Sequence, residues 1–324
     1  MSEGEWDPFR IITVVEDDYA VWPLVAFRDE RNRTVVISSF GGGDEIAAWD
    51  VRTGQRGWSY DGGEYFCYAT SVISSRGGRS ILIVGHEDGA ERFDARTGEQ
   101  LSSFPLRETA VWGVDSGILS SGQEIVVAAG YDGSVHRWDP ATAESVGSPL
   151  EGHAISVKSV ALAPISAQGT MIVSGDDAGV IRRWDAVSGE PIGDPIQSFD
   201  GPVRQIASVN IASSGTMLIT TGSEGEISRW DALTGEKIGD THRVGAGIAQ
   251  ISTVYVDGIC QILSAGSDNC MRRWEAMSGR LLDASTPGYS VTAVDDVDGL
   301  LTVASGTIDG KLILCHPGGE VPAR

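Results

Sequence analysis

A short phrase recurs along the chain at a nearly constant spacing. It consists of an alternating apolar run, an aromatic residue, an acid and a small-residue turn. Six copies, 44 to 46 residues apart, contain the pairs Trp49-Asp50, Phe93-Asp94, Trp138-Asp139, Trp184-Asp185, Trp230-Asp231 and Trp274-Glu275, and a seventh, eroded copy ends at Cys315-His316. A unit of this size cannot bury its apolar face alone and must stack on its neighbours. The period therefore predicts one domain, residues 1–324, in place of the two that length alone suggests.

The fourth repeat predicts the structure of one unit. Its first strand is expected at residues 157–162 and ends before Pro164, because proline cannot extend a ladder. A second strand is expected at 171–174 and a third at 180–184, and residues 185–189 then turn the chain into a short outer strand. The sequence thus predicts an all-β fold of four-stranded antiparallel units.

The turn after each aromatic-acid pair is nearly invariant. Five copies place glycine where the hairpin needs positive φ, at Gly54, Gly98, Gly189, Gly235 and Gly279. The third repeat has Ala143 there, so that turn is either strained or of another type.

These residues resemble the tryptophan-aspartate repeat (WD-repeat) β-propeller family over essentially the whole chain. The resemblance rests on the Gly-His opening at 152–153, the Ser-Gly strand end at 174–175 and the Trp-Asp pair at 184–185, repeated in register. It implies a seven-bladed β-propeller with a buried network of loop His, second-strand Ser or Thr, turn Asp and third-strand Trp in each blade. In the fourth repeat Ala178 stands where the turn Asp is expected. Other repeats keep an acid there, namely Asp88, Asp132, Asp268, Asp309 and the longer Glu224.

The resemblance also implies how the blades close on each other. The last repeat, residues 291–316, supplies three strands only, and Phe9–Val15 at the other end of the chain is a spare strand. Residues 9–15 are therefore expected to form the outer strand of the seventh blade.

Composition excludes several classes of partner. A net charge of -21 and a pI near 4.5 disfavour nucleic acid and anionic membranes. No apolar run approaches 18 residues, and the first five residues include two acids and no base, so we expect a cytoplasmic protein. The sequence does not define the oligomeric state, and a monomer is the working expectation. The four cysteines have no CxxC spacing, which indicates reduced thiols.

No motif for catalysis or for a cofactor is present. The chain has no phosphate-binding glycine loop, no nucleophile elbow and no His or Cys metal pair. Residues 295–299 match a calcium loop for five positions, then lack the remaining ligands, so a loop between strands is predicted. We expect no cofactor, no metal and no catalytic residue.

An arginine precedes the aromatic in five repeats, at Arg92, Arg137, Arg183, Arg229 and Arg273. A periodic residue usually serves the repeat itself, so each guanidinium is predicted to pair with carboxylates of the adjacent blade or of the outer strand. The alternative is a functional ring of cations.

The candidate binding site lies at the start of the first strands. The position after Val157 and its counterparts is occupied by Trp22, Cys67, Trp112, Lys158, Arg204, Ala249 and Thr292. The resemblance implies that partners dock near these positions, on the top face, and tryptophans beside cations are typical of interface hot spots. The predicted partner-binding residues are Trp22, Tyr68, Trp112, Lys158, Arg204 and Tyr289. Alternatively, Trp22 and Trp112 pack between blades.

We therefore expect a non-catalytic scaffold or recognition module that binds a protein or peptide presenting acidic and apolar groups together. The alternative is an enzyme or small-molecule binder at the mouth of the central channel, where Asp115, Asp295, Tyr68 and His153 supply acid-base groups. A third possibility is a structural member of a larger complex, bound through its outer rim.

Overall fold

The computed structural model describes residues 10–14, 20–40, 45–62, 66–75, 78–106, 109–165, 169–211, 215–256, 258–285, 287–297 and 300–315. These residues form 27 strands in seven sheets. The chain divides into two compact units, residues 1–63 with 249–324 and residues 64–248. The sheets are called blades 1 to 7 along the chain, and the first strands of these blades are β2, β6, β10, β13, β17, β21 and β25 in that order.

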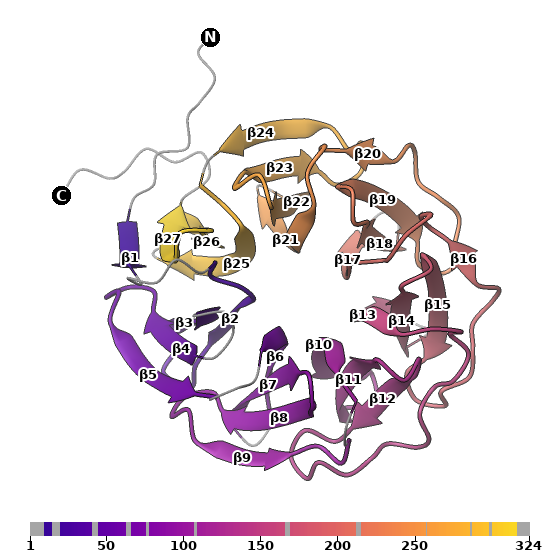
Figure 1. Ribbon diagram of the computed structural model, residues 1–324, viewed down its shortest axis with the longest axis horizontal. Coiled ribbons are helices and arrows are strands. Elements are labelled where there is room, and N and C mark those ends of the chain that lie inside the picture. The colour runs from indigo at the N-terminus through magenta and orange to yellow at the C-terminus, as the bar shows by residue number, and fades with distance from the viewer. Residues whose placement is uncertain are drawn as a thin grey trace. The chain divides into compact units, whose positions relative to one another are not determined.

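The first unit contains blades 1, 6 and 7, each with four strands (Figure 1). Blade 1 consists of β2 (Leu24–Arg28), β3 (Thr34–Phe40), β4 (Glu45–Asp50) and β5 (Arg56–Asp61). Blade 6 consists of β21 (Ile248–Val256), β22 (Ile259–Gly266), β23 (Met271–Glu275) and β24 (Leu281–Ser285). Blade 7 consists of β25 (Ser290–Val297), β26 (Leu300–Gly306), β27 (Lys311–Cys315) and β1 (Arg10–Val14).

The second unit contains blades 2 to 5 (Figure 1). Blade 2 consists of β6 (Cys67–Ser74), β7 (Ser80–His86), β8 (Gly89–Asp94) and β9 (Gln100–Ser103), and blade 3 of β10 (Val111–Ile118), β11 (Glu124–Gly130) and β12 (Val135–Trp138). Blade 4 consists of β13 (Val157–Ile165), β14 (Gly169–Asp176), β15 (Val180–Asp185) and β16 (Ile196–Gln197), and blade 5 of β17 (Gln205–Ile211), β18 (Gly215–Thr221), β19 (Glu226–Asp231) and β20 (His242–Arg243).

Six of the seven described sheets have the predicted four strands, and blade 3 has three. The segment after β12 touches it only through the isolated bridges Val135↔Leu150 and Trp138↔Ser145. The outer strands of blades 4 and 5 are also short, with two residues each. The period therefore predicted the first three strands of these repeats better than the outermost one.

The prediction that Pro164 ends the first strand of blade 4 is wrong. β13 continues to Ile165, and Pro164 pairs with Thr170 in β14. β13 lies at the edge of its sheet, where a missing N–H interrupts no second ladder.

The apolar cores lie between successive blades, as stacking repeats require. One cluster joins blades 4 and 5 and includes Val173, Ile181, Leu218 and Trp230, all 5% exposed or less. The other described clusters likewise join blades 2 and 3, 3 and 4, 6 and 7, and 7 and 1. Each blade thus depends on its neighbours for burial.

β1 runs antiparallel to β27 at the edge of blade 7. Arg10 pairs with Leu314 and Val14 with Lys311, with a register shift between Ile11 and Thr13. Phe9 and Val15, the ends of the predicted strand, lie outside the described residues.

Ala143 adopts the left-handed backbone of its glycine counterparts, with φ of 63°. Its N–H donates to the Asp139 carbonyl at 2.9 Å, as the N–H of Gly189 does to Asp185 in blade 4. The third repeat therefore keeps the same turn and tolerates the strain.

We expect Ala143→Gly to stabilise the protein. A non-glycine residue in this conformation costs about 1 kcal/mol, and the lost methyl contact with the blade 2–3 core offsets part of that gain. Urea unfolding of the parent and the variant measures the difference. A lower midpoint for Ala143→Gly would show that the methyl contact outweighs the strain.

Candidate partner-binding site

Three predicted site residues in the second unit share one structural feature. Tyr68, Trp112 and Lys158 are each the extra residue of a β-bulge near the start of the first strand. A bulge re-aims a side chain away from the regular alternation. Arg204 directly precedes the first strand of blade 5, and its N–H donates to the Thr221 carbonyl at 2.8 Å, the same register position.

Two predicted residues hold this position in the first unit. The N–H of Trp22 donates to the Ser39 carbonyl at 3.3 Å, and the N–H of Tyr289 donates to the Gly306 carbonyl at 2.7 Å. Tyr289, rather than Thr292, is therefore the blade 7 member of the column.

Cys67 is likewise displaced from the predicted column. Cys67 is the residue before the bulge, where it pairs with His86 and is 4% exposed. Tyr68 follows it and is the bulge residue. Counting residues from one repeat to the next missed both shifts, because the alignment could not locate the start of each first strand.

The three bulge residues pack against one another. The rings of Tyr68 and Trp112 are stacked, with centroids 4.3 Å apart and planes 24° apart. The Nζ of Lys158 lies 3.7 Å from the centroid of the Trp112 ring and 3.3 Å from a carboxylate oxygen of Asp177. The stack thus links the first strands of blades 2, 3 and 4 through aromatic and cation–π contacts.

The blade 2 end of the stack is held by Glu87. Burial, followed by the charge and hydrogen bond of Glu87, raises the pKa of Tyr68. The same carboxylate accepts the N–H of Phe66 at 2.9 Å. Glu87 therefore fixes both the phenol and the backbone that leads into β6.

Exposed apolar side chains occur at the same ends of the strands. Phe66 is 51% exposed, Tyr131 63% and Ile155 43%. Tyr131 in blade 3 corresponds to Glu87 in blade 2 and Asp177 in blade 4. In each of these blades the first residue after the bulge pairs with a residue of the second strand, and the corresponding position lies two residues further along the chain. Tyr131 and Ile155 were not among the predicted site residues, although apolar residues within otherwise polar turns were an available signal.

Trp22 is engaged within the first unit. Its indole N–H donates to the Ala249 carbonyl at 3.2 Å and the side chain is half-buried. Nearby, the Gln250 amide donates to the carbonyl of Leu24 at 2.7 Å and accepts its N–H at 3.2 Å. These bonds join the first strands of blades 1 and 6.

The repeat arginines bind chiefly to backbone carbonyls, which corrects the prediction of carboxylate partners. Nη1 of Arg183 donates to the carbonyls of Ala232 and Leu233, at 3.2 and 2.7 Å, in the Asp-turn of the next blade. Arg137 and Arg92 reach the corresponding turns of blades 4 and 3.

Carboxylates still act on these arginines at a distance. Burial lowers the pKa of Arg183, and the charges of Asp231 and Asp194 oppose that effect. Arg273 does form the predicted ion pair, with Asp283 of its outer strand. Four of the five arginines are 6% exposed or less, and the fifth, Arg273, lies within an ion pair, so a ring of free cations does not form among the described residues.

The buried polar network of blade 4 is complete, although Ala178 stands at the expected acid position. The Trp184 indole donates to Ser174 at 2.9 Å, His153 Nε2 lies 2.7 Å from Ser174 Oγ, and His153 Nδ1 lies 2.8 Å from Asp176. Asp176, two residues before Ala178, thus supplies the acid and also accepts the N–H of Ala178 at 2.9 Å. Burial lowers the pKa of His153, although Asp176 acts in the opposite direction.

Each described candidate acid-base group interacts with its own set of neighbouring residues. Asp115 accepts the N–H groups of Ser116 and Leu162, at 2.7 and 2.8 Å, while burial raises its pKa to about 6. Its ionisation above that pH opposes folding, so its contribution to stability falls as the pH rises from about 4 to 6. Tyr68 and His153 have the partners described above, and the side chain of Asp295 lies outside the described residues.

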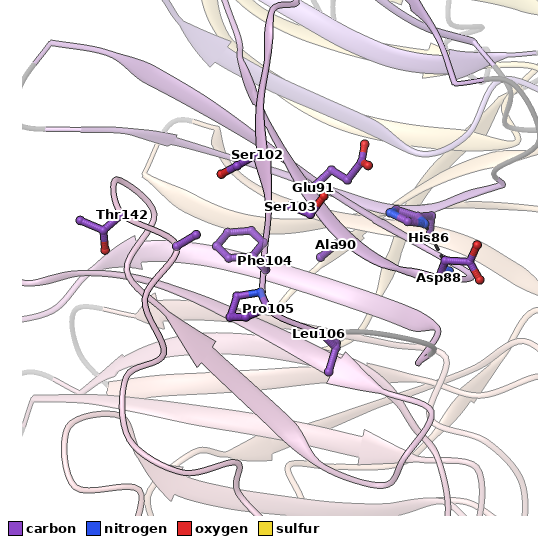
Figure 2. A pocket seen from close by; sticks show the side chains of 11 residues that line it. His86, Asp88, Ala90, Glu91, Ser102, Ser103, Phe104, Pro105, Leu106 and Thr142 are labelled. Carbon is purple, nitrogen blue, oxygen red and sulfur yellow. Dashed lines mark hydrogen bonds between the residues drawn. The ribbon is translucent and has the colours of Figure 1, made fainter.

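A cavity of about 780 Å³ lies beside blades 2 and 3 (Figure 2). Its lining consists of His86, Asp88, Ala90, Glu91, Ser102, Ser103, Phe104, Pro105, Leu106, Thr142 and Ala143. Phe104 stacks on Trp138 with centroids 4.7 Å apart, and the Arg92 guanidinium lies 5.7 Å from its ring centroid. None of the predicted partner-binding residues lines this cavity.

The described residues contain neither a cluster of metal ligands nor a membrane-spanning helix. No group of three or more His, Cys, Asp or Glu side chains is placed there to hold a metal ion. No helix among them has the length and apolarity needed to cross a membrane.

Comparison with known proteins identifies the repeat and the fold. The family model "WD domain, G-beta repeat" matches residues 144–185, which contain β13, β14 and β15. Among solved structures, the chain is similar to the computationally designed Ika8 protein, with 19% sequence identity and a TM-score of 0.61, over 94% of this chain and 99% of that chain. A search of curated proteins gave no significant match.

The chain therefore contains a WD40 repeat, and its seven sheets are the blades of a β-propeller. Domains of this class typically serve as protein-interaction scaffolds.

Proposed function

We propose that this chain is a non-catalytic recognition module that binds a protein or peptide at the starts of its first strands. The proposed binding residues are Trp22, Tyr68, Trp112, Lys158, Arg204 and Tyr289. The observation that carries the proposal is the stack of Tyr68, Trp112 and Lys158, which holds two half-buried aromatic side chains in a fixed geometry. Rigid aromatic anchors lose little entropy on binding and are typical of hot spots.

Exposure at the same place supports the proposal. Phe66, Tyr131 and Ile155 are each more than 40% exposed, and large apolar side chains gathered at one end of a sheet indicate an interaction surface. Lys158 serves this surface mainly by orienting Trp112, because its charge is balanced by Asp177. The acidic composition disfavours nucleic acid and anionic membranes, which leaves a protein or peptide as the proposed partner. The proposed module is cytoplasmic and needs no cofactor.

The test begins with affinity capture of the native partner and its identification by mass spectrometry. We expect Trp112→Ala and Arg204→Glu each to weaken binding of that partner by about 2 kcal/mol or more, the hot-spot scale. Tyr255→Ala, which removes an aromatic 50% exposed on β21, is the matched control and should bind like the parent. Circular dichroism and thermal melting confirm that each variant is folded. Parental affinity for both site variants would remove this surface from consideration.

We also propose that residues 1–324 form one domain, closed by β1 at the edge of blade 7. The pairing of β1 with β27 supports this proposal, because it joins the two ends of the chain in one sheet. Deleting residues 1–16 should lower the melting temperature sharply, since β27 would become an unpaired edge. Deleting residues 1–8 leaves β1 intact and is the control. Equal melting of the two truncated proteins would show that closure does not depend on β1.

A further inference from the structure

Blades 4 and 5 differ in how they balance the cation at the shared register position. In blade 4 the Nζ of Lys158 lies 3.3 Å from Asp177. In blade 5 the cation is Arg204, and Ser223 stands at the register place of Asp177. Serine carries no charge, so the balance found in blade 4 has no equivalent in blade 5.

Arg204 is also available to solvent. Its side chain is exposed, and its guanidinium makes no ion pair or hydrogen bond with the residues that the structure describes. A guanidinium presents a planar fork of donors that fits a carboxylate in two parallel hydrogen bonds. Arg204 is therefore the cation of this surface that can receive an external acid.

The apolar part of the surface lies on the other side of Lys158, at blade 3. Tyr131 follows the second strand of blade 3 at the register place next to Trp112. The backbone carbonyl of Ile155 lies against Gly133 of the same turn, which brings the loop before β13 close to Tyr131. Both side chains are more than 40% exposed. An apolar side chain of a partner would find two exposed neighbours here.

We propose that this surface of the second unit binds an extended peptide segment of another protein, in which an aspartate or glutamate side chain is accompanied by an apolar side chain. The carboxylate pairs with Arg204, and the apolar side chain packs on Tyr131 and Ile155. This inference rests on the proposed function and narrows it to one surface and one chemistry. Specificity comes from Arg204, the cation of this surface that no described carboxylate balances, because the molecule carries a net charge of -21 and repels acidic segments elsewhere.

The electrostatic part of this recognition should act at short range. At physiological salt an exposed charge is screened beyond about 8 Å, so Arg204 influences an acidic segment only once the apolar contact has begun to form. Affinity should therefore require both features in one peptide.

The experiment selects peptides from a random phage-displayed library on the full-length chain. The selected sequences are then synthesised with acetylated and amidated ends, so that only side chains carry charge, and their dissociation constants are measured by fluorescence anisotropy. We expect the enriched peptides to share an acidic residue at a fixed distance from an aromatic or aliphatic residue. Arg204→Glu and Tyr131→Ala should each weaken binding about tenfold or more.

A charge-reversal pair and a control make the assignment specific. Replacing the acidic residue of the peptide by lysine should restore much of the affinity for Arg204→Glu protein. Arg31→Glu reverses another exposed arginine, in the turn after β2, and should leave binding unchanged.

Three outcomes would overturn the inference. These are enriched peptides without a shared acid, unchanged binding to Arg204→Glu, and an equal loss of binding for Arg31→Glu. If enriched peptides bind but ignore Arg204 and Tyr131, the recognition function survives and this surface is wrong. If no peptide family is enriched and affinity capture also yields no partner, both this inference and the proposed recognition function fail.

Discussion

Replacing Arg183 by methionine is expected to destabilise the protein by about 3 kcal/mol. The guanidinium is 5% exposed and donates to the carbonyls of Ala232 and Leu233 in the next blade. Methionine keeps the apolar stem but leaves the buried Ala232 carbonyl and the part-buried Leu233 carbonyl without their charged donor. An unsatisfied buried group costs about 1 to 3 kcal/mol, and the part-buried carbonyl adds less because water can reach it. Relief of the buried charge offsets part of this cost. Denaturant unfolding at neutral pH measures the change.

Arg182→Met is the matched control for this prediction. Arg182 is the adjacent residue of β15, is half-buried and lies 6.0 Å from the Trp184 ring. Its loss removes a cation–π contact of about 1 kcal/mol or less. An equal effect of the two substitutions would mean that Arg183 acts as a generic surface cation rather than as a link between blades.

The glycines around Arg183 show that the link is built into the repeat. A Cβ on Gly193 would lie 2.6 Å from Nη2 of Arg183, and one on Gly235 would lie 2.9 Å from it. Both glycines have positive φ, so the backbone already requires them there. Periodicity located Arg183, but nothing in the sequence distinguishes a carbonyl partner from a carboxylate partner, because both accept the same donors.

The repeat predicted where the strands lie along the chain, but it did not predict their local register. Alternating apolar runs located the second and third strands of blade 4, because those strands are buried and must match both neighbours. The first strands of blades 2, 3 and 4 have a bulge near their start, and a bulge shifts the register without any change in composition. That shift is why Tyr68 rather than Cys67 belongs to the site column.

The candidate site was predictable in part for the same reason. Trp112, Lys158 and Arg204 were located by counting, since their blades share the spacing of blade 4. Contacts between them depend on how successive blades approach, which a single repeat does not encode. The neutralisation of Lys158 by Asp177 and its absence at Arg204 therefore required coordinates.

Replacing His153 by phenylalanine is expected to cost about 3 to 4 kcal/mol at pH 7. The His153 side chain is fully buried and Asp176 is 2% exposed, so phenylalanine leaves a buried carboxylate oxygen without its donor. Removing the donor to a buried carboxylate is costly, because neither water nor another group replaces it. Asp176 retains the N–H groups of Ala178 and Val180, which limits the loss.

His136→Phe supplies the matched control, and pH supplies a second test. His136 lies 2.9 Å from Asp132, but the Asp132 side chain is 36% exposed, so water can replace the lost donor and the cost should stay below about 1 kcal/mol. Burial lowers the pKa of folded His153 below its unfolded value, so the parent loses stability as the pH falls below about 6.5. His153→Phe escapes that loss, because phenylalanine has no group that titrates in this range. The difference in unfolding free energy between parent and variant should therefore become smaller from pH 7 to pH 5. A difference that does not change with pH would show that the substitution acts through packing instead.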